Sequence, residues 1–143
     1  MILDRLNIND QHAWEMCATH HMRLLHKMKA RDLAQMMDLF DKDVLDATGE
    51  PVYMQKAPEA FFERIAGILP VQIPYLKRWE LIRCLEVLVK RNLGSERLFL
   101  HYIFLYIERQ VLKYDVDLYC RMIRAIADKN FVEDSIFWDK HIF

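Results

Sequence analysis

The sequence predicts an all-α protein: a short right-handed stack of about three antiparallel helical hairpins, like an α-solenoid, with one extra helix at the N-terminal end. Three observations support this prediction. Only three Gly and four Pro interrupt 143 residues that are rich in Leu and Met, which favours helices over many short strands. The chain is 53% hydrophobic, so disorder is not expected and residues 1–143 suit a single domain. Two helix junctions, RNLGSERLF (91–99) and KNFVEDSIF (129–137), also share one pattern.

The first two helices are expected before a long connection. The first covers about 10–28, with Asn9 as its N-cap. The second covers about 30–47 and is ended by the sequence TGEP, which contains both a Gly and a Pro. The connection PVYMQKAP that follows is the only long one we expect.

Proline residues bound the third helix, which is expected over about 58–69. Pro58 suits the first helical turn, because the N–H that proline lacks is not needed there. Pro70 and Pro74 are expected to break the chain after Leu69.

The remaining helices are predicted from their caps. Gly94 fits the C-terminal end of the fourth helix, and Ser95, Asp115 and Asp134 fit the N-caps of the next three. Short loops between these helices predict antiparallel neighbours. The fourth to seventh helices are expected over about 75–92, 96–114, 116–130 and 135–143.

A recurring pattern relates three of these helices. An acid–Leu pair followed by apolar residues occurs three times, with its Leu at positions 33, 81 and 118, which are 48 and 37 positions apart. The two junctions lie 38 positions apart. The longer first interval contains the long connection. We therefore expect three helix pairs over 30–143, with 1–29 forming a separate helix.

The segments ELIRCLEVLVKRNLGSERLF (80–99) and DLYCRMIRAIADKNFVEDSIFW (117–138) resemble the degenerate helical-hairpin repeats of organelle proteins. These include the heptatricopeptide-like arrays found beside RAP domains and FAST-kinase-like regions. The resemblance covers about 30–143 and implies a mitochondrial or plastid location, with a role beside organellar RNA or in a large organellar assembly. The chain departs from the larger members, because it has about three units, no RAP domain and no net positive charge.

Charge is balanced overall but unevenly spread. The net charge of -1 argues against a general polyanion binder. Residues 30–50 hold two basic and six acidic side chains, whereas 77–97 hold six basic and three acidic ones. With Tyr75 and Trp79 nearby, the basic group is expected to contact an acidic partner or, alternatively, an RNA backbone. Its members are Lys77, Arg78, Arg83, Lys90, Arg91 and Arg97.

Apolar side chains mark a second expected contact region. The fifth helix is apolar on every side between Phe99 and Ile107, and the chain ends in an aromatic segment where a repeat array needs a polar cap. Another protein is expected to cover these residues, the alternative being that the last helix folds back onto the core. The residues expected to bind a partner are Tyr102, Tyr106, Phe137, Trp138, Ile142 and Phe143.

Residues with catalytic or metal-binding chemistry are few or explained otherwise. His12, Cys17, His20, His21 and His26 lie on the first helix, but the two ligand pairs across a loop that zinc sites use are missing. No nucleophile motif or Gly-rich phosphate loop occurs. We therefore expect no enzyme, no metal and no cofactor. Three widely spaced cysteines favour a reducing compartment, and the longest apolar run, LFLHYIFLYI, is too short to span a bilayer.

These observations predict a non-catalytic structural subunit of a large mitochondrial complex, held by contacts with other protein subunits. An ATP synthase, a respiratory complex and the mitoribosome all fit the resemblance. The alternative is an RNA-binding helical-repeat protein of organellar RNA metabolism or mitoribosome assembly.

Overall fold

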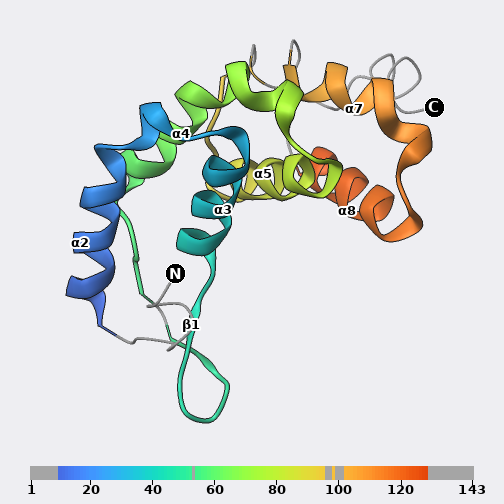
Figure 1. Ribbon diagram of the computed structural model, residues 1–143. Coiled ribbons are helices and arrows are strands. Elements are labelled where there is room, and N and C mark those ends of the chain that lie inside the picture. The colour runs from blue at the N-terminus through green and yellow to red at the C-terminus, as the bar shows by residue number, and fades with distance from the viewer. Residues whose placement is uncertain (1–9, 53, 96–97, 99–101, 129–143) are drawn as a thin grey trace.

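The computed structural model describes residues 10–52, 54–95, 98 and 102–128, and these are mostly helical (Figure 1). Within them the α-helices are α2, α3, α4, α5, α7 and α8, and the one sheet has two very short strands. The all-α prediction is confirmed. In the described residues no helix combines the length and the apolar character needed to cross a membrane.

Helix α2 (Gln11–Met22) begins as predicted, but its N-cap is Asp10 and not Asn9. The Asp10 carboxylate accepts hydrogen bonds from two backbone N–H groups of the first turn, at 3.0 and 3.4 Å. The predicted continuation to Met28 is wrong. A separate 3-10 turn, η1 (Leu25–Lys27), follows the helix instead.

Helix α3 (Ala30–Asp41) ends before the predicted position, Ala47. The residues that follow form a hairpin of β1 (Val44–Leu45) and β2 (Pro51–Val52), paired antiparallel. Figure 1 shows this hairpin projecting from the end of α3, away from the other helices.

The turn of the hairpin explains why the helix stops early. The carboxylate of Asp46 accepts the backbone N–H groups of Thr48 and Glu50 at 2.8 and 3.0 Å. An aspartate that bonds the backbone following it competes with helix formation. The hydrogen bond from the Thr48 side chain, with those from the backbone, also lowers the pKa of Asp46. Gly49 completes the turn with a φ of 85°, a value that favours glycine.

Helix α4 (Glu59–Gln72) continues through Pro70, so the expected break at that residue is wrong. A 3-10 turn, η2 (Ile73–Tyr75), follows directly. Leu69 and Ile73, on either side of the proline, are both fully buried. Their packing keeps the backbone helical where local preference alone would end it.

Helix α5 (Arg78–Lys90) has Arg91 as its C-cap, and the residue that breaks it is Asn92 and not the predicted Gly94. Asn92 has a φ of 54°, and its N–H and that of Leu93 turn back to carbonyl oxygens of the last helical turns. This is the hydrogen-bond pattern of a Schellman motif, in which Asn is an accepted substitute for Gly.

The last described elements are α7 (Phe104–Gln110), the 3-10 turn η4 (Val111–Lys113) and α8 (Val116–Ala127). Asp115 is the N-cap of α8, as predicted, and its carboxylate accepts a backbone N–H of the first turn at 2.8 Å. The seventh predicted helix, 135–143, lies outside the described residues.

An aromatic cluster joins the N-terminal helix to the rest of the core. Trp14 of α2 meets Phe40 of α3 with ring centroids 5.6 Å apart, and Phe40 meets Phe61 of α4 at 4.7 Å. Beyond this cluster α3 packs against α5, and α5 against α8. Helix α2 therefore shares one core with the helices predicted to repeat.

One local structure occurs three times in the described chain. A three-residue 3-10 turn, one linking residue and an N-cap precede a helix of 12 or 13 residues. The N-caps are Lys29, Lys77 and Asp115, separated by 48 and 38 positions. The β1–β2 hairpin lies in the longer interval. We call these segments unit 1 (25–41), unit 2 (73–90) and unit 3 (111–127).

Candidate functional site

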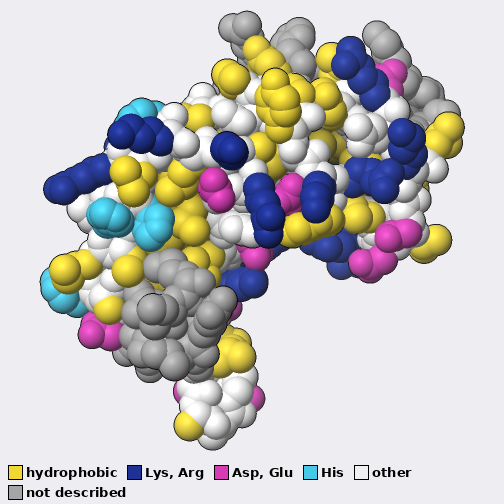
Figure 2. Space-filling view, in the orientation of Figure 1, with side chains coloured by type: hydrophobic (Ala, Val, Ile, Leu, Met, Phe, Trp, Pro, Cys, Tyr) yellow, Lys and Arg dark blue, Asp and Glu magenta, His cyan; other side chains and the backbone are white. Residues whose placement is uncertain are grey.

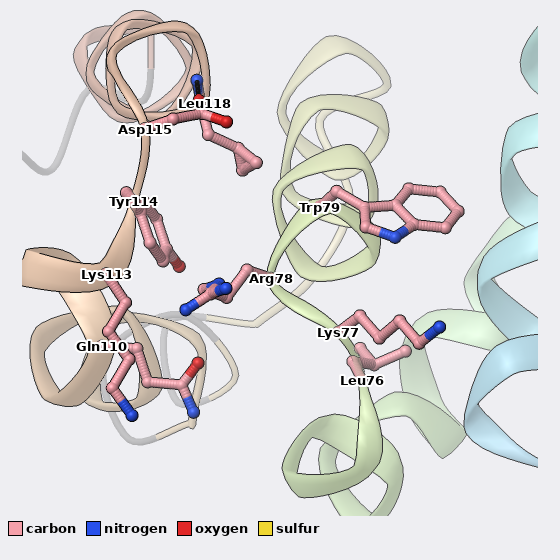
Figure 3. A pocket seen from close by; sticks show the side chains of 9 residues that line it. All are labelled: Leu76, Lys77, Arg78, Trp79, Gln110, Lys113, Tyr114, Asp115 and Leu118. Carbon is pink, nitrogen blue, oxygen red and sulfur yellow. Dashed lines mark hydrogen bonds between the residues drawn. The ribbon is translucent and has the colours of Figure 1, made fainter.

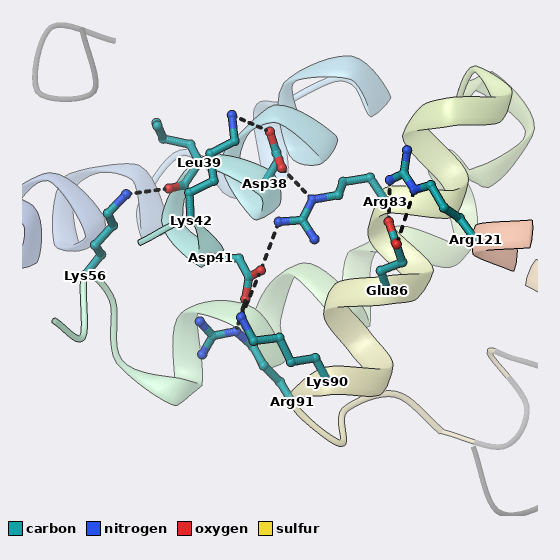
Figure 4. A network of polar contacts seen from close by, with 10 residues as sticks. All are labelled: Asp38, Leu39, Asp41, Lys42, Lys56, Arg83, Glu86, Lys90, Arg91 and Arg121. Atoms are coloured by element: carbon teal, nitrogen blue, oxygen red, sulfur yellow. Dashed lines mark hydrogen bonds and ion pairs between the residues drawn. The ribbon is translucent and has the colours of Figure 1, made fainter. Parts of the chain in front are cut away.

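Two carboxylates of α3 meet two cations of α5 and a third at its C-cap, Arg91, where the helices pack (Figure 4). Asp41 is only 6% exposed, and it accepts from Arg91 at 2.9 Å, from Arg83 at 3.0 Å and from Lys90 at 3.3 Å. Asp38 accepts from Nε of the same Arg83 at 2.5 Å. A carboxylate this buried is stable as an anion only with such partners, so this network holds α3 against α5.

The environment of Asp38 keeps it ionised. Burial by itself would raise the pKa of Asp38, but hydrogen bonds and charges from Arg83 and Lys42 outweigh burial and lower the pKa below its ordinary value. The Lys42 amine lies 3.1 Å from the carboxylate on the solvent side. Asp38 is therefore an anion at neutral pH.

A second ion pair occupies the equivalent place between α5 and α8. Glu86 of α5 pairs with the guanidinium of Arg121 in α8 (Figure 4). Asp38 and Glu86 each lie nine positions after their N-cap, while Arg83 and Arg121 each lie six positions after theirs. Both interfaces thus join an acid of one unit to an arginine of the next. The interval of 37 expected from the helix pattern aligned Arg83 with Cys120, whereas the caps align it with Arg121.

The basic residues predicted to contact RNA or an acidic partner do not act as one group. Three of them are the cations that pair with Asp41. Lys77 and Arg78 are exposed at the start of α5, and Arg97 lies outside the described residues. The acidic region 30–50 and the basic region 77–97 therefore partly neutralise each other inside the molecule.

A cleft of about 640 Å³ lies between the start of α5 and the η4–α8 corner (Figure 3). The cation Arg78 extends between its two walls toward Tyr114. Lys77 and Lys113 add positive charge, one from each wall, and Asp115 adds a carboxylate. The cleft is thus a mixed-charge site with more cations than acids.

Tyr114 is the polar group of this cleft that the described residues leave unsatisfied. Its hydroxyl is buried and finds no hydrogen-bond partner among them. Burial raises the pKa of Tyr114 to about 12, although the nearby charge of Arg78 opposes this. The phenol is therefore protonated at neutral pH and can donate a hydrogen bond.

Large apolar side chains are exposed in the two segments that form the cleft. Tyr75 and Trp79, of which Trp79 lines the cleft, are 76% and 50% exposed near the start of α5, and Leu112 and Val116 are 98% and 80% exposed in the η4–α8 corner. Figure 2 shows Lys and Arg side chains interleaved with hydrophobic ones on one face of the molecule. Scattered apolar residues are ordinary on a surface, whereas a contiguous exposed apolar patch is the kind of feature that marks interaction sites.

The sequence prediction included Trp79, which lines the cleft, and its neighbour Tyr75. It missed the lining residues of the opposite wall: Gln110, Lys113, Tyr114, Asp115 and Leu118. A usable signal was present. The sequences LHKM, IPYL and VLKY, each directly before an N-cap, share apolar residues at their first and last positions. This recurrence would have identified η4 as the same corner as η2.

The residues predicted to bind a partner lie elsewhere or outside the described chain. Tyr102 and Tyr106 are half-buried against the core, and the Tyr106 hydroxyl donates to the Pro74 carbonyl oxygen at 3.5 Å. The four others lie outside the described residues: Phe137, Trp138, Ile142 and Phe143.

The histidine-rich helix α2 contains ordinary helix contacts. His21 Nδ1 donates to the Cys17 carbonyl oxygen at 2.7 Å, one turn earlier. Within residues 10–52, 54–95, 98 and 102–128, no three His, Cys, Asp or Glu side chains are arranged to hold a metal ion.

The described residues form a mainly helical protein with an open cleft that is lined by charged and apolar side chains. No protein-family model matches the chain, and no curated protein or solved structure matches it either.

Proposed function

We propose that the chain is a non-catalytic scaffold subunit, a short stack of helical-hairpin repeats that acts through contacts with other proteins. The observation that carries this proposal is the threefold recurrence of turn, cap and helix. Stacked units of this kind bury a shared core and leave one long surface for binding. The ion pairs between successive units, at equivalent positions, support a stack with a fixed order.

The chemistry of the cleft supports binding rather than catalysis. Its carboxylate, Asp115, already caps α8. Its phenol, Tyr114, has a pKa raised to about 12 and is a poor base at neutral pH. Neither group is poised to take a proton from a substrate.

The proposed setting is a large mitochondrial complex: an ATP synthase, a respiratory complex or the mitoribosome. This part of the proposal rests on the resemblance of residues 80–99 and 117–138 to organellar helical repeats. The near-neutral charge of the chain favours a position mainly among proteins.

RNA binding is the second candidate function, and exposed Lys77 and Arg78 beside the aromatic Trp79 favour it. It is weakened because three of the six basic residues expected to serve it pair with Asp41. An RNA-backbone contact would lose affinity steeply as salt rises, whereas apolar docking would not.

Sizing the native species tests both candidates. The tagged protein is expressed in its own cell, mitochondria are extracted gently, and the extract is run on a sizing gradient with and without RNase. We expect a large particle that resists RNase. A particle that collapses with RNase would favour the RNA candidate, and a free monomer of 17.3 kDa in both runs would overturn the scaffold proposal.

A further inference from the structure

The cations beside the cleft lack the carboxylate partners that the cations of the α3–α5 interface have. Lys77, Arg78 and Lys113 are exposed, and none of them forms an ion pair within the part of the chain that the structure describes. The carboxylate lining the cleft, Asp115, is already bonded to the backbone N–H of Leu118 at 2.8 Å. Positive charge therefore exceeds negative charge in the cleft.

Two of these cations stand where helix geometry disfavours them. Lys77 is the N-cap of α5 and Arg78 is its first residue. The N-terminus of a helix carries partial positive charge, so it favours acids and disfavours cations. The acid of this turn, Glu80, is only 2% exposed and accepts the Lys77 N–H at 2.8 Å. An acidic group from outside would be attracted by both the side chains and the helix end.

The unpartnered hydroxyl of Tyr114 fits the same ligand. It faces Arg78 across the cleft (Figure 3). Because the phenol is protonated, it can donate one hydrogen bond and can also accept one from the guanidinium. A carboxylate bound to Arg78 would offer this hydroxyl an acceptor. A buried hydroxyl without a partner costs free energy, so this arrangement favours an occupied cleft.

The apolar surroundings favour a protein segment over a nucleic acid. Leu112 and Val116 are almost fully exposed in the same corner as Lys113, and an RNA backbone of phosphates and hydroxylated sugars covers aliphatic side chains poorly. A protein segment with acidic and apolar side chains satisfies the cations and the apolar surface together. Arg, Trp and Tyr, the side-chain types at this site, are those that most often dominate protein interfaces.

We propose that this cleft is the docking site for an acidic segment of a partner protein. Its carboxylates reach Arg78 and Lys113, and its apolar side chains cover Leu112 and Val116. The inference rests on the proposed scaffold function and names the kind of partner that this surface accepts.

Peptide binding to the full chain tests the inference in solution. The probe is a fluorescein-labelled synthetic peptide in which Glu alternates with Leu and Phe, measured by anisotropy. A peptide with Gln in place of Glu and a uridine oligoribonucleotide of similar length are the comparison probes. The cleft variant is Arg78→Glu, and the matched control is Arg31→Glu, because Arg31 is an exposed cation in the first turn of α3 outside the cleft.

Both variants introduce an acid at a helix start, where it is stabilising, so loss of fold does not confound them. We expect the acidic peptide to bind, with Kd raised at least about tenfold by Arg78→Glu and less than about twofold by Arg31→Glu. Failure of the acidic peptide to bind better than the Gln peptide would overturn the inference. So would equal losses in the two variants, or Arg78-dependent binding of the oligoribonucleotide alone.

The sizing gradient separates this inference from the function it rests on. The wild type and Arg31→Glu should migrate with the large particle, and Arg78→Glu should migrate free. If the wild type and Arg78→Glu migrate together in the particle, the scaffold function stands and the docking site is wrong. If the wild type itself migrates as a monomer, the scaffold function fails first.

Discussion

Helix α5 meets its two neighbouring units in different ways. Toward α3, its cations Arg83, Lys90 and Arg91 are held by Asp38 and Asp41, and the interface is closed and charged. Toward the η4–α8 corner its start borders an open cleft, where the cations have no carboxylate partner among the described residues.

The comparison shows that position along one helix decides what a basic residue does. Arg83 lies in the middle of α5, where α3 supplies carboxylates, so its charge fixes the packing of two helices. Arg78 lies at the exposed start, where the carboxylate that the described part of the opposite wall presents, Asp115, is already used as a cap. Charge that is satisfied internally contributes to stability, and charge left over is available for a partner.

The largest expected effect on stability comes from a substitution in the closed interface between α3 and α5. Asp41→Asn keeps the size of the side chain but removes the charge that three cations share. We expect the free energy of unfolding, measured in urea, to fall by about 2–4 kcal/mol. The loss is limited to this range because the cations are partly exposed and can turn toward water.

The neighbouring Asp43→Asn is the matched control, because Asp43 is exposed and forms no ion pair with the described residues. We expect this control to change the free energy of unfolding by less than about 0.5 kcal/mol. Equal effects of the two substitutions would show that the network does not hold the interface.

A smaller effect compares the two equivalent ion pairs. Arg83→Ala leaves a buried carboxylate short of a partner and should cost about 1–3 kcal/mol. Arg121→Ala removes a more exposed pair with Glu86 and should cost less than about 1 kcal/mol. Reversing the second pair, Glu86→Arg with Arg121→Glu, should recover most of that loss. If the reversed pair is no better than either single reversal, the two side chains do not interact in solution.

The pH dependence of the closed interface gives a third comparison. Asp38 has a folded-state pKa below its ordinary value of 3.8, so it binds its proton less readily when folded. Its contribution to stability is present above the unfolded pKa and is lost as pH falls through the lowered folded pKa. The difference in unfolding free energy between wild type and Asp38→Asn should therefore shrink below about pH 4. A difference that stays constant from neutral to acidic pH would contradict the paired carboxylate.

The helical class and the interval between units could be predicted because both depend on local signals. Asp115 caps α8 as expected, and the interval of 48 positions between units 1 and 2 was already visible in the sequence. Helix ends were less predictable. The second predicted helix ends early because the residues around Asp46 form a turn. Helix α4 continues past Pro70 because Leu69 and Ile73 are buried in the core.

The site could be predicted only in part, because counting charges does not show which helix faces meet. The basic residues of 77–97 were expected to face an acidic partner or RNA, but three of them face the acidic side chains of 30–50 instead. The aromatic wall of the cleft was expected, but the wall containing Lys113 depends on where the third unit begins. An interval of 38 rather than 37 positions rotates every residue of α8 by about 100° around the helix axis, enough to change which of them face α5.

The smallest expected effect on stability concerns the two lysines that are N-caps of α3 and α5. Lys29 and Lys77 are equivalent exposed N-caps, each with an N–H bonded by an acid three positions later, but only Lys77 lines the cleft. Replacing either by Glu removes a cation from a helix start, so each variant should unfold within about 0.5–1 kcal/mol of the wild type, with the same sign for both. Binding of the acidic peptide should separate them, because Lys77→Glu alone weakens it. Two variants matched in stability and in binding would show that the cleft attracts acids no more than the rest of the surface does.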